Sequence, residues 1–450
     1  MPSEYAAFTL DEFASTVHRE LEKNGRSSPD ESVLKQLLGT LYYASLKTEE
    51  RHPITCHVAY MRPPDPDDSS LKGRLLNSCR FWKWNEEKDL TVSNVVKASM
   101  ATDPRSSALA VYPDPNDLDK LKIWGLVDQC NRRHDFVNQE YDSDYGPLCA
   151  GDFQIEIRGT GHIAAYLDYF VMAEVRVNEP ITTIDVLAKG TVHDKLTPAI
   201  KDHVERVWLD AKGTTPCACC PPYLKKDWVR TLTRMLKRIQ GYGHGGTVLI
   251  TPSPAGNLLI KYGVDYGRLG ASLSRYGAAW VQEERTIALL DDKCERNEAI
   301  PAKLYKQGER LGRRVRTAEN ELSGCIWFVS LLSRVDGLVL LSPQLQVQGY
   351  GVEIRSDSRV DNVYIATGPY ANVKKLEPRS CEHYGTRHRS MMRYCHDDKK
   401  AVGFVISQDG DVRAMTNVMG RVVMWENVRL ERFTYVGSHK RARRADAPQR

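Results

Sequence analysis

The feature that most constrains the fold of this 450-residue chain is a series of apolar segments, each ending in a polar turn. The apolar residues Cys325 to Leu332 end at Arg334-Val-Asp-Gly337, which leads into a second apolar run, Leu338 to Leu341. Farther along, Tyr384-Gly-Thr-Arg-His-Arg-Ser390 precedes a strand-like segment, Ala401 to Ile406, that ends in Ser407-Gln-Asp409. The pattern predicts polar clusters at the rim of one sheet.

Two of these clusters have the chemistry of a metal–nucleotide site. Asp336 lies between a predicted helix, about Arg316 to Leu332, and a buried strand, and Gly337 allows a backbone or ligand to approach closely. Gly385 to Arg389 form a predicted loop that opens a short helix, whose free N–H groups and Arg side chains can cradle phosphate. Mg²⁺ prefers oxygen ligands and bridges phosphates, so a carboxylate beside such a cradle suits it.

The spacing leaves a second interpretation open. In it, Asp336 is an ordinary surface carboxylate, and Arg387-His-Arg389 is only a solvated helix start.

In this order the motifs resemble the diadenylate cyclase (DAC) domain of bacterial DNA-integrity scanning proteins and membrane-bound cyclic di-AMP synthases. That family has Asp-Gly-Ala, then Gly-Thr-Arg-His-Arg-Ala, then Ser-Glu-Glu at a strand end. His244 to Ile250 resembles its first core strand and Leu258 to Gly263 the next segment, so the resemblance covers roughly Trp228 to Arg429.

This chain departs from the cyclase pattern at three points. Leu338 replaces Ala, Gln408-Asp409 replaces Glu-Glu, and Tyr350 to Ile354 stands where the family has Leu-Pro-Leu. A charged helical insert, about Gln282 to Glu321, also separates the first strands from Asp336. The organisation is closer to the divergent DACNV-type proteins, predicted nucleotide sensors of bacterial conflict systems that carry an N-terminal domain before the DAC-like one.

The resemblance implies roles for individual residues and a cofactor, Mg²⁺ or Mn²⁺ with ATP. It implies a catalytic set of Asp336, Arg387, His388 and Arg389, and a metal held by Asp336 and Asp409. The implied nucleotide-binding residues are Gly337, Leu338, Tyr350, Gly351, Gly385, Thr386 and Ser407.

Two functions of different classes follow from the resemblance. One is a non-catalytic sensor, in which ATP or a cyclic dinucleotide shifts the N-terminal domain or an effector protein. The substitutions at Leu338 and Gln408 favour it. The alternative is an active diadenylate cyclase, in which two ATP-loaded domains meet as a face-to-face homodimer and form cyclic di-AMP. Catalysis would then come from positioning and charge stabilisation.

Charge and composition argue against a membrane or nucleic-acid function. Of the formal net charge of +5, residues 439–450 carry +4, so the rest of the chain is nearly neutral and a broad nucleic-acid surface is not expected. The acidic residues among the first twelve argue against a signal peptide, and no apolar stretch is long enough for a membrane span. Eleven cysteines without disulfide-like spacing indicate a reducing compartment, the cytoplasm.

Helix and strand signals predict two domains. Residues 1–212 read as an α+β, sensor-like domain with a mostly antiparallel sheet, and 213–226 as a linker. Residues 227–432 read as a DAC-like α/β domain with a central mixed sheet flanked by helices, and 433–450 as a basic, disordered tail.

Local signals predict several boundaries. Thr9 and Glu12 form a capping box for the first helix, Thr197-Pro198 begins a helix that ends near Ala211, and Asp227 caps a helix from Trp228 to Gln240. Cys217-Ala-Cys219-Cys220 is the tightest cysteine cluster. It fits a zinc site, and alternatively a linker or a redox-sensitive turn.

Overall fold

The computed structural model describes residues 8–23, 29–63, 80–103, 106–128, 153–167, 170–211, 220–254 and 256–430. The chain divides into two compact units between Thr182 and Thr183, and the second unit ends at Leu430.

The first unit begins with two helices, α1 (Leu10–Lys23) and α2 (Glu31–Ser45). The capping box predicted before α1 is confirmed. The backbone N–H of Thr9 donates to Glu12 Oε2 at 2.7 Å, and that of Glu12 donates to Thr9 Oγ1 at 3.2 Å. A third helix, α4 (Val92–Ser99), is capped by the Thr91 side chain, which accepts from the N–H of Asn94.

The strands of the first unit form a small pair and a large sheet. The small pair is β1 (Thr48–Glu49) with β2 (His52–Pro53). Within the described residues the large sheet has the order β10-β9-β8-β7-β3-β5-β6-β4. Only its β3–β5 pair is parallel among the described pairs, so the predicted antiparallel character is confirmed. These strands are β3 (Cys56–Tyr60), β4 (Arg80–Asp89), β5 (Ser107–Asp114), β6 (Asp117–Asp128), β7 (Phe153–Gly159), β8 (His162–Leu167), β9 (Phe170–Arg176) and β10 (Glu179–Pro180).

Apolar and polar side chains alternate along β7, and this alternation shows which face of the sheet packs against the helices. Phe153, Ile155 and Ile157 belong to one apolar core with residues of α1, α2 and α4, whereas Gln154 and Glu156 project to the opposite face. The helices therefore cover one face of the sheet, in an α+β arrangement.

The second unit contains a mixed sheet, ordered β12-β14-β13-β11-β17-β18-β19-β15-β16 among the described residues. The pairs β11–β13 and β15–β19 are parallel, and the other pairs among the described residues of this sheet are antiparallel. Its strands are β11 (Gly246–Ile250), β12 (Leu258–Tyr266), β13 (Leu338–Leu341), β14 (Val347–Ile354), β15 (Asn362–Ile365), β16 (Glu377–Ser380), β17 (Val402–Ile406), β18 (Val412–Val418) and β19 (Arg421–Trp425). The predicted mixed sheet is confirmed.

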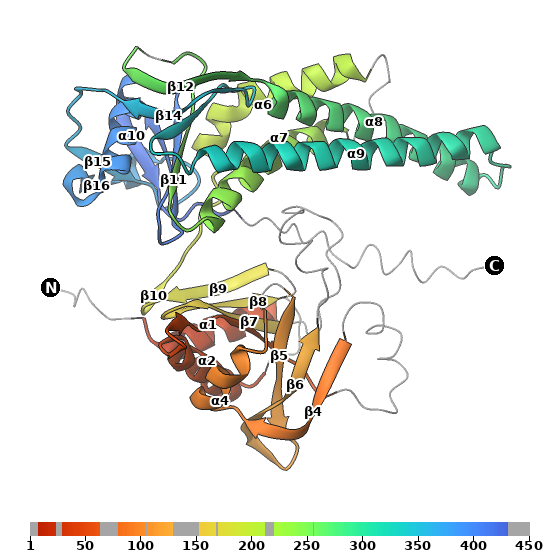
Figure 1. Ribbon diagram of the computed structural model, residues 1–450, viewed down its shortest axis with the longest axis vertical. Coiled ribbons are helices and arrows are strands. Elements are labelled where there is room, and N and C mark those ends of the chain that lie inside the picture. The colour runs from red at the N-terminus through yellow and green to blue at the C-terminus, as the bar shows by residue number, and fades with distance from the viewer. Residues whose placement is uncertain are drawn as a thin grey trace. The chain divides into compact units, whose positions relative to one another are not determined.

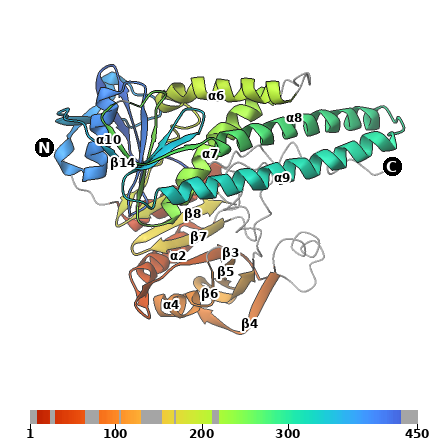
Figure 2. The same ribbon diagram turned by 45° about the horizontal axis from the view of Figure 1, so that its top comes forward.

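Helices cover both faces of this sheet (Figures 1 and 2). Helices α6 (Thr191–Asp210), α7 (Cys220–Gly241), α8 (Arg268–Glu295) and α9 (Ala302–Leu332) share one core with it, and α10 (Thr386–Asp397) contributes to the other. Short 3₁₀ turns, η1 (Val373–Lys375) and η2 (Cys381–His383), precede α10. In β13, Val339 and Leu341 belong to the first core and Leu338 and Leu340 to the second, so the strand is buried on both faces.

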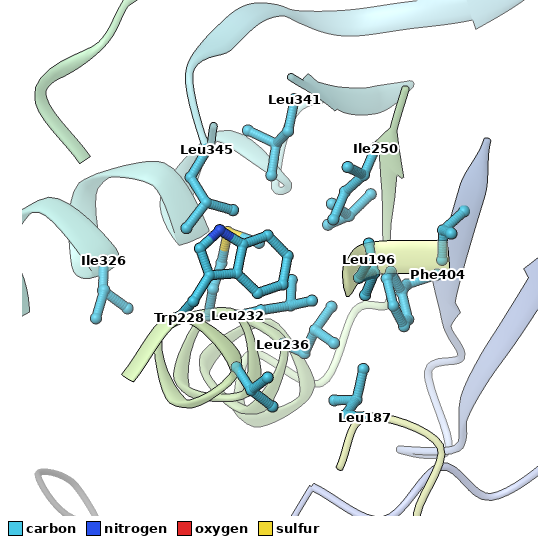
Figure 3. Packing of buried hydrophobic residues seen from close by; sticks show 14 of the residues in the cluster. Leu187, Leu196, Trp228, Leu232, Leu236, Ile250, Ile326, Leu341, Leu345 and Phe404 are labelled. Atoms are coloured by element: carbon cyan, nitrogen blue, oxygen red, sulfur yellow. The ribbon is translucent and has the colours of Figure 1, made fainter. Parts of the chain in front are cut away.

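Trp228 lies at the centre of the core between the helices and the sheet (Figure 3). Its side chain is 1% exposed. The surrounding residues come from helices and strands far apart in the sequence, among them Leu196, Leu232, Leu236, Ile250, Ile326, Leu341 and Phe404. Burying this large ring therefore joins helices α6, α7 and α9 to strands β11, β13 and β17.

Several boundaries differ from those that the sequence predicted. The division at residue 182 is earlier than the expected linker at 213–226, because Val192, Leu196 and Ile200 of α6 pack into the core of the second unit. Helix α7 begins at Cys220, so its first residues include Pro221 and Pro222, which suit a helix start.

Two predicted helix starts are wrong for related reasons. Asp227 is buried inside α7 instead of capping it, and its Oδ1 lies 3.3 Å from Arg230 Nη1. Pro198 lies inside α6, which already begins at Thr191. Burial of apolar residues before each predicted start outweighs the local signal.

The charged insert predicted from Gln282 to Glu321 contains the second half of α8, the connection to α9 and the first two thirds of α9, and these two long helices are antiparallel (Figure 1). Polar contacts join them. Arg275 Nη2 donates to Glu321 Oε1 at 2.8 Å, and Arg314 Nη1 donates to Gln282 Oε1 at 3.2 Å. Within the described ranges, no helix is long and apolar enough to cross a lipid bilayer.

Replacing Trp228 by alanine tests the core directly. We expect Trp228→Ala to lower the free energy of unfolding of the second unit by about 3–5 kcal/mol, because a large cavity replaces a buried ring.

The matched control is Trp327→Ala on α9. Trp327 is 52% exposed and contacts Arg238, whose guanidinium carbon lies 4.3 Å from the ring centroid, so its loss should cost about 1 kcal/mol or less. Urea denaturation followed by far-UV circular dichroism distinguishes the two. Equal costs for the two variants would contradict the assignment of Trp228 as the core residue.

Candidate functional site

Gly245 lies where several polar segments of the second unit meet. Its φ is +75°, and a Cβ at this position would lie 2.9 Å from Arg387 Nη1, 2.9 Å from the carbonyl oxygen of Ile406 and 3.4 Å from the backbone nitrogen of Gln408. Arg387 Nη1 also donates to the carbonyl oxygen of His244 at 3.4 Å. The turn before β11, the start of α10 and the end of β17 therefore converge on one edge of the sheet.

Asp336 reaches the same edge from the turn between α9 and β13. Its Oδ1 lies 3.8 Å from Arg387 Nη2. The Asp336 side chain is 96% exposed and that of Arg387 45%, so solvent screens this pair and it contributes little to stability. A carboxylate and a guanidinium that are close together but solvent-exposed remain available to a ligand.

Close backbone contact fixes the turn that carries Asp336. Gly337 has φ +115°, and a Cβ there would lie 2.5 Å from the carbonyl carbon of Gly351 in β14. Gly351 itself has φ +61°, and a Cβ there would lie 3.4 Å from the carbonyl oxygen of Asp336. Gly337 therefore requires glycine, since a larger residue would force the two backbones apart, whereas at Gly351 it is the positive φ that favours glycine. The close approach expected at Gly337 is to the protein's own backbone.

The Gly-Thr-Arg-His-Arg segment forms the first turn of α10, with Gly385 as the N-cap residue. No side-chain hydrogen bond caps this helix start among the described residues, and Thr386, Arg387 and Arg389 are exposed. Its leading N–H groups, with the arginines beside them, form a positive end that favours an anion.

His388 has a different environment from the arginines on either side of it. Its Nε2 lies 3.0 Å from Arg413 Nη1, and its ring is 5.8 Å from that of Tyr384. Burial, followed by the nearby charges of Arg413 and Arg387, lowers the pKa of His388 to about 4. The imidazole is therefore neutral at pH 7, and its Nε2 accepts the hydrogen bond from Arg413. A role for His388 in phosphate binding remains a prediction.

Other predicted site residues lie at or under the same edge. The Leu338 side chain is 4% exposed and belongs to the core beneath α10. Ser407 Oγ accepts from the N–H of Asp411 at 3.0 Å, which shapes the turn between β17 and β18. Asp409 is exposed in that turn. Cys217 and Cys219, two of the three cysteines of the zinc hypothesis, lie outside the described residues, and Cys220 is buried in α7.

One aromatic residue beside the site, Tyr262, was missed by the sequence analysis, whereas its neighbour Tyr350 was among the implied nucleotide-binding residues. The rings of Tyr262 and Tyr350 stack with centroids 4.9 Å apart and planes 15° apart, and Tyr262 is 51% exposed. A Cβ at Gly351 would lie 3.1 Å from Tyr262 Cδ2, so the pair adjoins the Asp336–Gly337 turn. Tyr262 lies in β12, in the segment that resembles a DAC strand. No motif marks this tyrosine, and only strand pairing brings it here.

The donors at this edge do not form a metal site on their own. Among the residues that the structure describes, no group of three or more His, Cys, Asp or Glu side chains could hold a metal ion. Asp336 could supply one carboxylate to Mg²⁺, which commonly takes its remaining ligands from phosphate and water. A metal at this position would therefore accompany a phosphate-bearing ligand.

Comparison with known proteins adds one family. Residues 23–128 match the family model of the probable sensor domain DACNV. This stretch lies in the first unit and contains α2, α4 and strands β1 to β6. The first unit thus contains a region similar to a probable sensor domain. No curated protein matches the chain. The relationship of residues 228–429 to diadenylate cyclases stays a prediction.

A titration tests the environment of His388. Its pKa in the folded protein is about 4, below the ordinary value of 6.5, so the unfolded chain takes up a proton first as the pH falls. Its contribution to stability is therefore present above pH 6.5 and is lost between pH 6.5 and about 4. We expect the His388 ring resonance, identified by its absence in His388→Gln, to titrate by NMR with a midpoint near 4. A midpoint near 6.5 would show that the ring is solvated.

Proposed function

We propose that this protein is a nucleotide sensor in a bacterial conflict or signalling system, and that its second unit binds ATP or a cyclic dinucleotide at the Asp336–Arg387 edge. One observation carries the proposal: Asp336 Oδ1 and Arg387 Nη2 lie 3.8 Å apart although 51 positions separate them in the chain, and both side chains are solvent-accessible. A phosphate-bearing ligand can contact both ends of this pair, directly at the guanidinium and through a cation at the carboxylate.

The phosphates would bind at the start of α10. Arg387 and Arg389 are exposed there, and the uncapped N–H groups add a partial positive charge. Charge-assisted hydrogen bonds from guanidinium groups are among the stronger polar contacts in proteins. Asp336 would hold Mg²⁺ or Mn²⁺ that accompanies the nucleotide. When bound, this ion would offset the charge of the phosphates.

The adenine base would stack on Tyr262. Its ring is about half exposed, is held in place by Tyr350 and lies beside Gly351. Stacking on an aromatic face suits any nucleobase, so this contact supplies affinity, whereas the choice of adenine follows from the DAC resemblance alone.

A sensor is favoured over a cyclase by the first unit and by the departures from the DAC pattern. Residues 23–128 are similar to a probable sensor domain, which suits a chain that converts ligand occupancy into a signal to an effector protein. Leu338 and Gln408 replace residues that the DAC family uses. The structure's Asp336–Arg387 pair is compatible with binding and does not by itself provide turnover.

Isothermal titration of ATP and cyclic di-AMP, with and without Mg²⁺, tests the proposal. We expect saturable binding that Arg387→Gln weakens about tenfold or more, because one charge-assisted contact to phosphate is lost. Arg393→Gln is the matched control: it removes the same charge from the same helix at an exposed position beyond the first turn. Asp336→Asn should remove the part of the affinity that depends on Mg²⁺. Equal effects of Arg387→Gln and Arg393→Gln would refute the site.

Product analysis separates the sensor from the cyclase. Full-length protein incubated with ATP and Mg²⁺ or Mn²⁺ should bind nucleotide and leave it unchanged on chromatography. Cyclic di-AMP that accumulates in the wild type and not in Asp336→Asn would replace the sensor assignment with that of a diadenylate cyclase.

A further inference from the structure

A cavity lies at the end of β13 opposite Asp336. Asp336 precedes this strand, whereas Gln344 and Gln346, which follow it, line a cavity of about 530 Å³. Helices α6, α8 and α9 contribute the remaining described lining residues. All these elements belong to the second unit, and Figure 2 shows the three helices on the same side of its sheet.

The lining of this cavity carries more positive than negative charge. Of its described residues, Arg206, Arg275 and Arg314 carry positive charge and Asp210 carries the one negative charge. Arg275 is paired with Glu321 at 2.8 Å. The other two contact neutral acceptors: Arg206 Nε donates to the carbonyl oxygen of Asp202 at 3.4 Å and Arg314 Nη1 to Gln282 Oε1. Neither forms an ion pair with a described carboxylate.

Ser274 supplies an independent sign that the cavity takes a polar ligand. Its side chain lines the cavity and is 5% exposed, yet its hydroxyl makes no hydrogen bond to any described residue. This hydroxyl is open to the cavity and is not engaged by another described residue, so it can donate to a ligand that accepts a hydrogen bond.

Small residues on α8 also line the cavity. The glycine among them accommodates the protein's own backbone, since a Cβ at Gly270 would lie 2.3 Å from the carbonyl oxygen of Gln344. Gly270, Ser274 and Ala278 are spaced four apart along one face of the helix, and all three line the cavity. Gly267, at the N-cap of α8, also lines it, and no side chain caps this helix start among the described residues. The positive end of the helix dipole therefore adds to the arginine charges.

We propose that this cavity binds a small phosphate-bearing molecule. Arg206 and Arg314 would contact its phosphate oxygens, and the Ser274 hydroxyl would donate a hydrogen bond to it. A volume of about 530 Å³ fits a compact ligand, in the range usual for small-molecule sites. A single-stranded nucleic acid would need an extended groove, whereas these arginines line one cavity. This site is separate from the Asp336–Arg387 edge and does not depend on the function proposed for it.

Pyrophosphate is the probe, used with the full chain in isothermal titration at low ionic strength. The titration is made in the Arg387→Gln background, so that the phosphate site proposed at α10 contributes less. We expect saturable binding that the double change Arg206→Gln with Arg314→Gln weakens at least about tenfold. Arg313→Gln is the matched control, because Arg313 is exposed on α9, next to Arg314, and does not line the cavity.

Ser274→Ala separates ligand binding from folding. Since the hydroxyl has no partner among the described residues, the variant should keep the wild-type melting temperature and still bind pyrophosphate about tenfold more weakly. Ala271→Leu, at an exposed position in the lining, should abolish binding by filling the cavity.

The proposal is overturned if about 10 mM pyrophosphate gives no saturable binding. It is also overturned if Arg313→Gln weakens binding as much as the double variant, or if both Ser274→Ala and Ala271→Leu bind like their parent.

Discussion

The backbone contact between Gly337 and Gly351 determines the geometry of the candidate site. Neither glycine could carry a Cβ without a backbone clash or an unfavourable positive φ, so β13 and β14 come together without intervening side chains. This contact holds the turn after α9 against the sheet and fixes the point from which Asp336 projects. The approach of Arg387 to Asp336 then depends on α10, which Met391 packs against Gly403 of β17.

Much of this arrangement could be predicted from the sequence. Continuous apolar runs identify β11, β13 and β17 as buried strands, which is typical of a sheet covered by helices on both faces. Polar turns at their ends then gather at the edges of that sheet, which is why Asp336 and Arg387 were expected to meet. The capping box at Thr9 was equally direct, because its two hydrogen bonds involve only residues three apart.

What the sequence could not provide were features set by distant contacts. Leu338 and Asp336 are two positions apart, but only the register of β13 decides that Leu338 joins the core under α10. His388 lies between two exposed arginines, but its pKa depends on burial and then on Arg413 in β18, neither of which a local pattern reveals. The predicted starts of α6 and α7 were wrong for a similar reason, because burial of neighbouring apolar residues outweighed the proline and aspartate signals.

Strand β13 has a mechanical consequence for the second unit. It is only four residues long, both its faces are buried, and it is hydrogen-bonded to β11 and β14 on either side. A strand so enclosed in a close-packed interior has no freedom to bend or stretch by itself. If the Asp336 end of the strand moves, the Gln344 end can therefore move with it only when the whole strand shifts as a rigid body, together with the sheet around it.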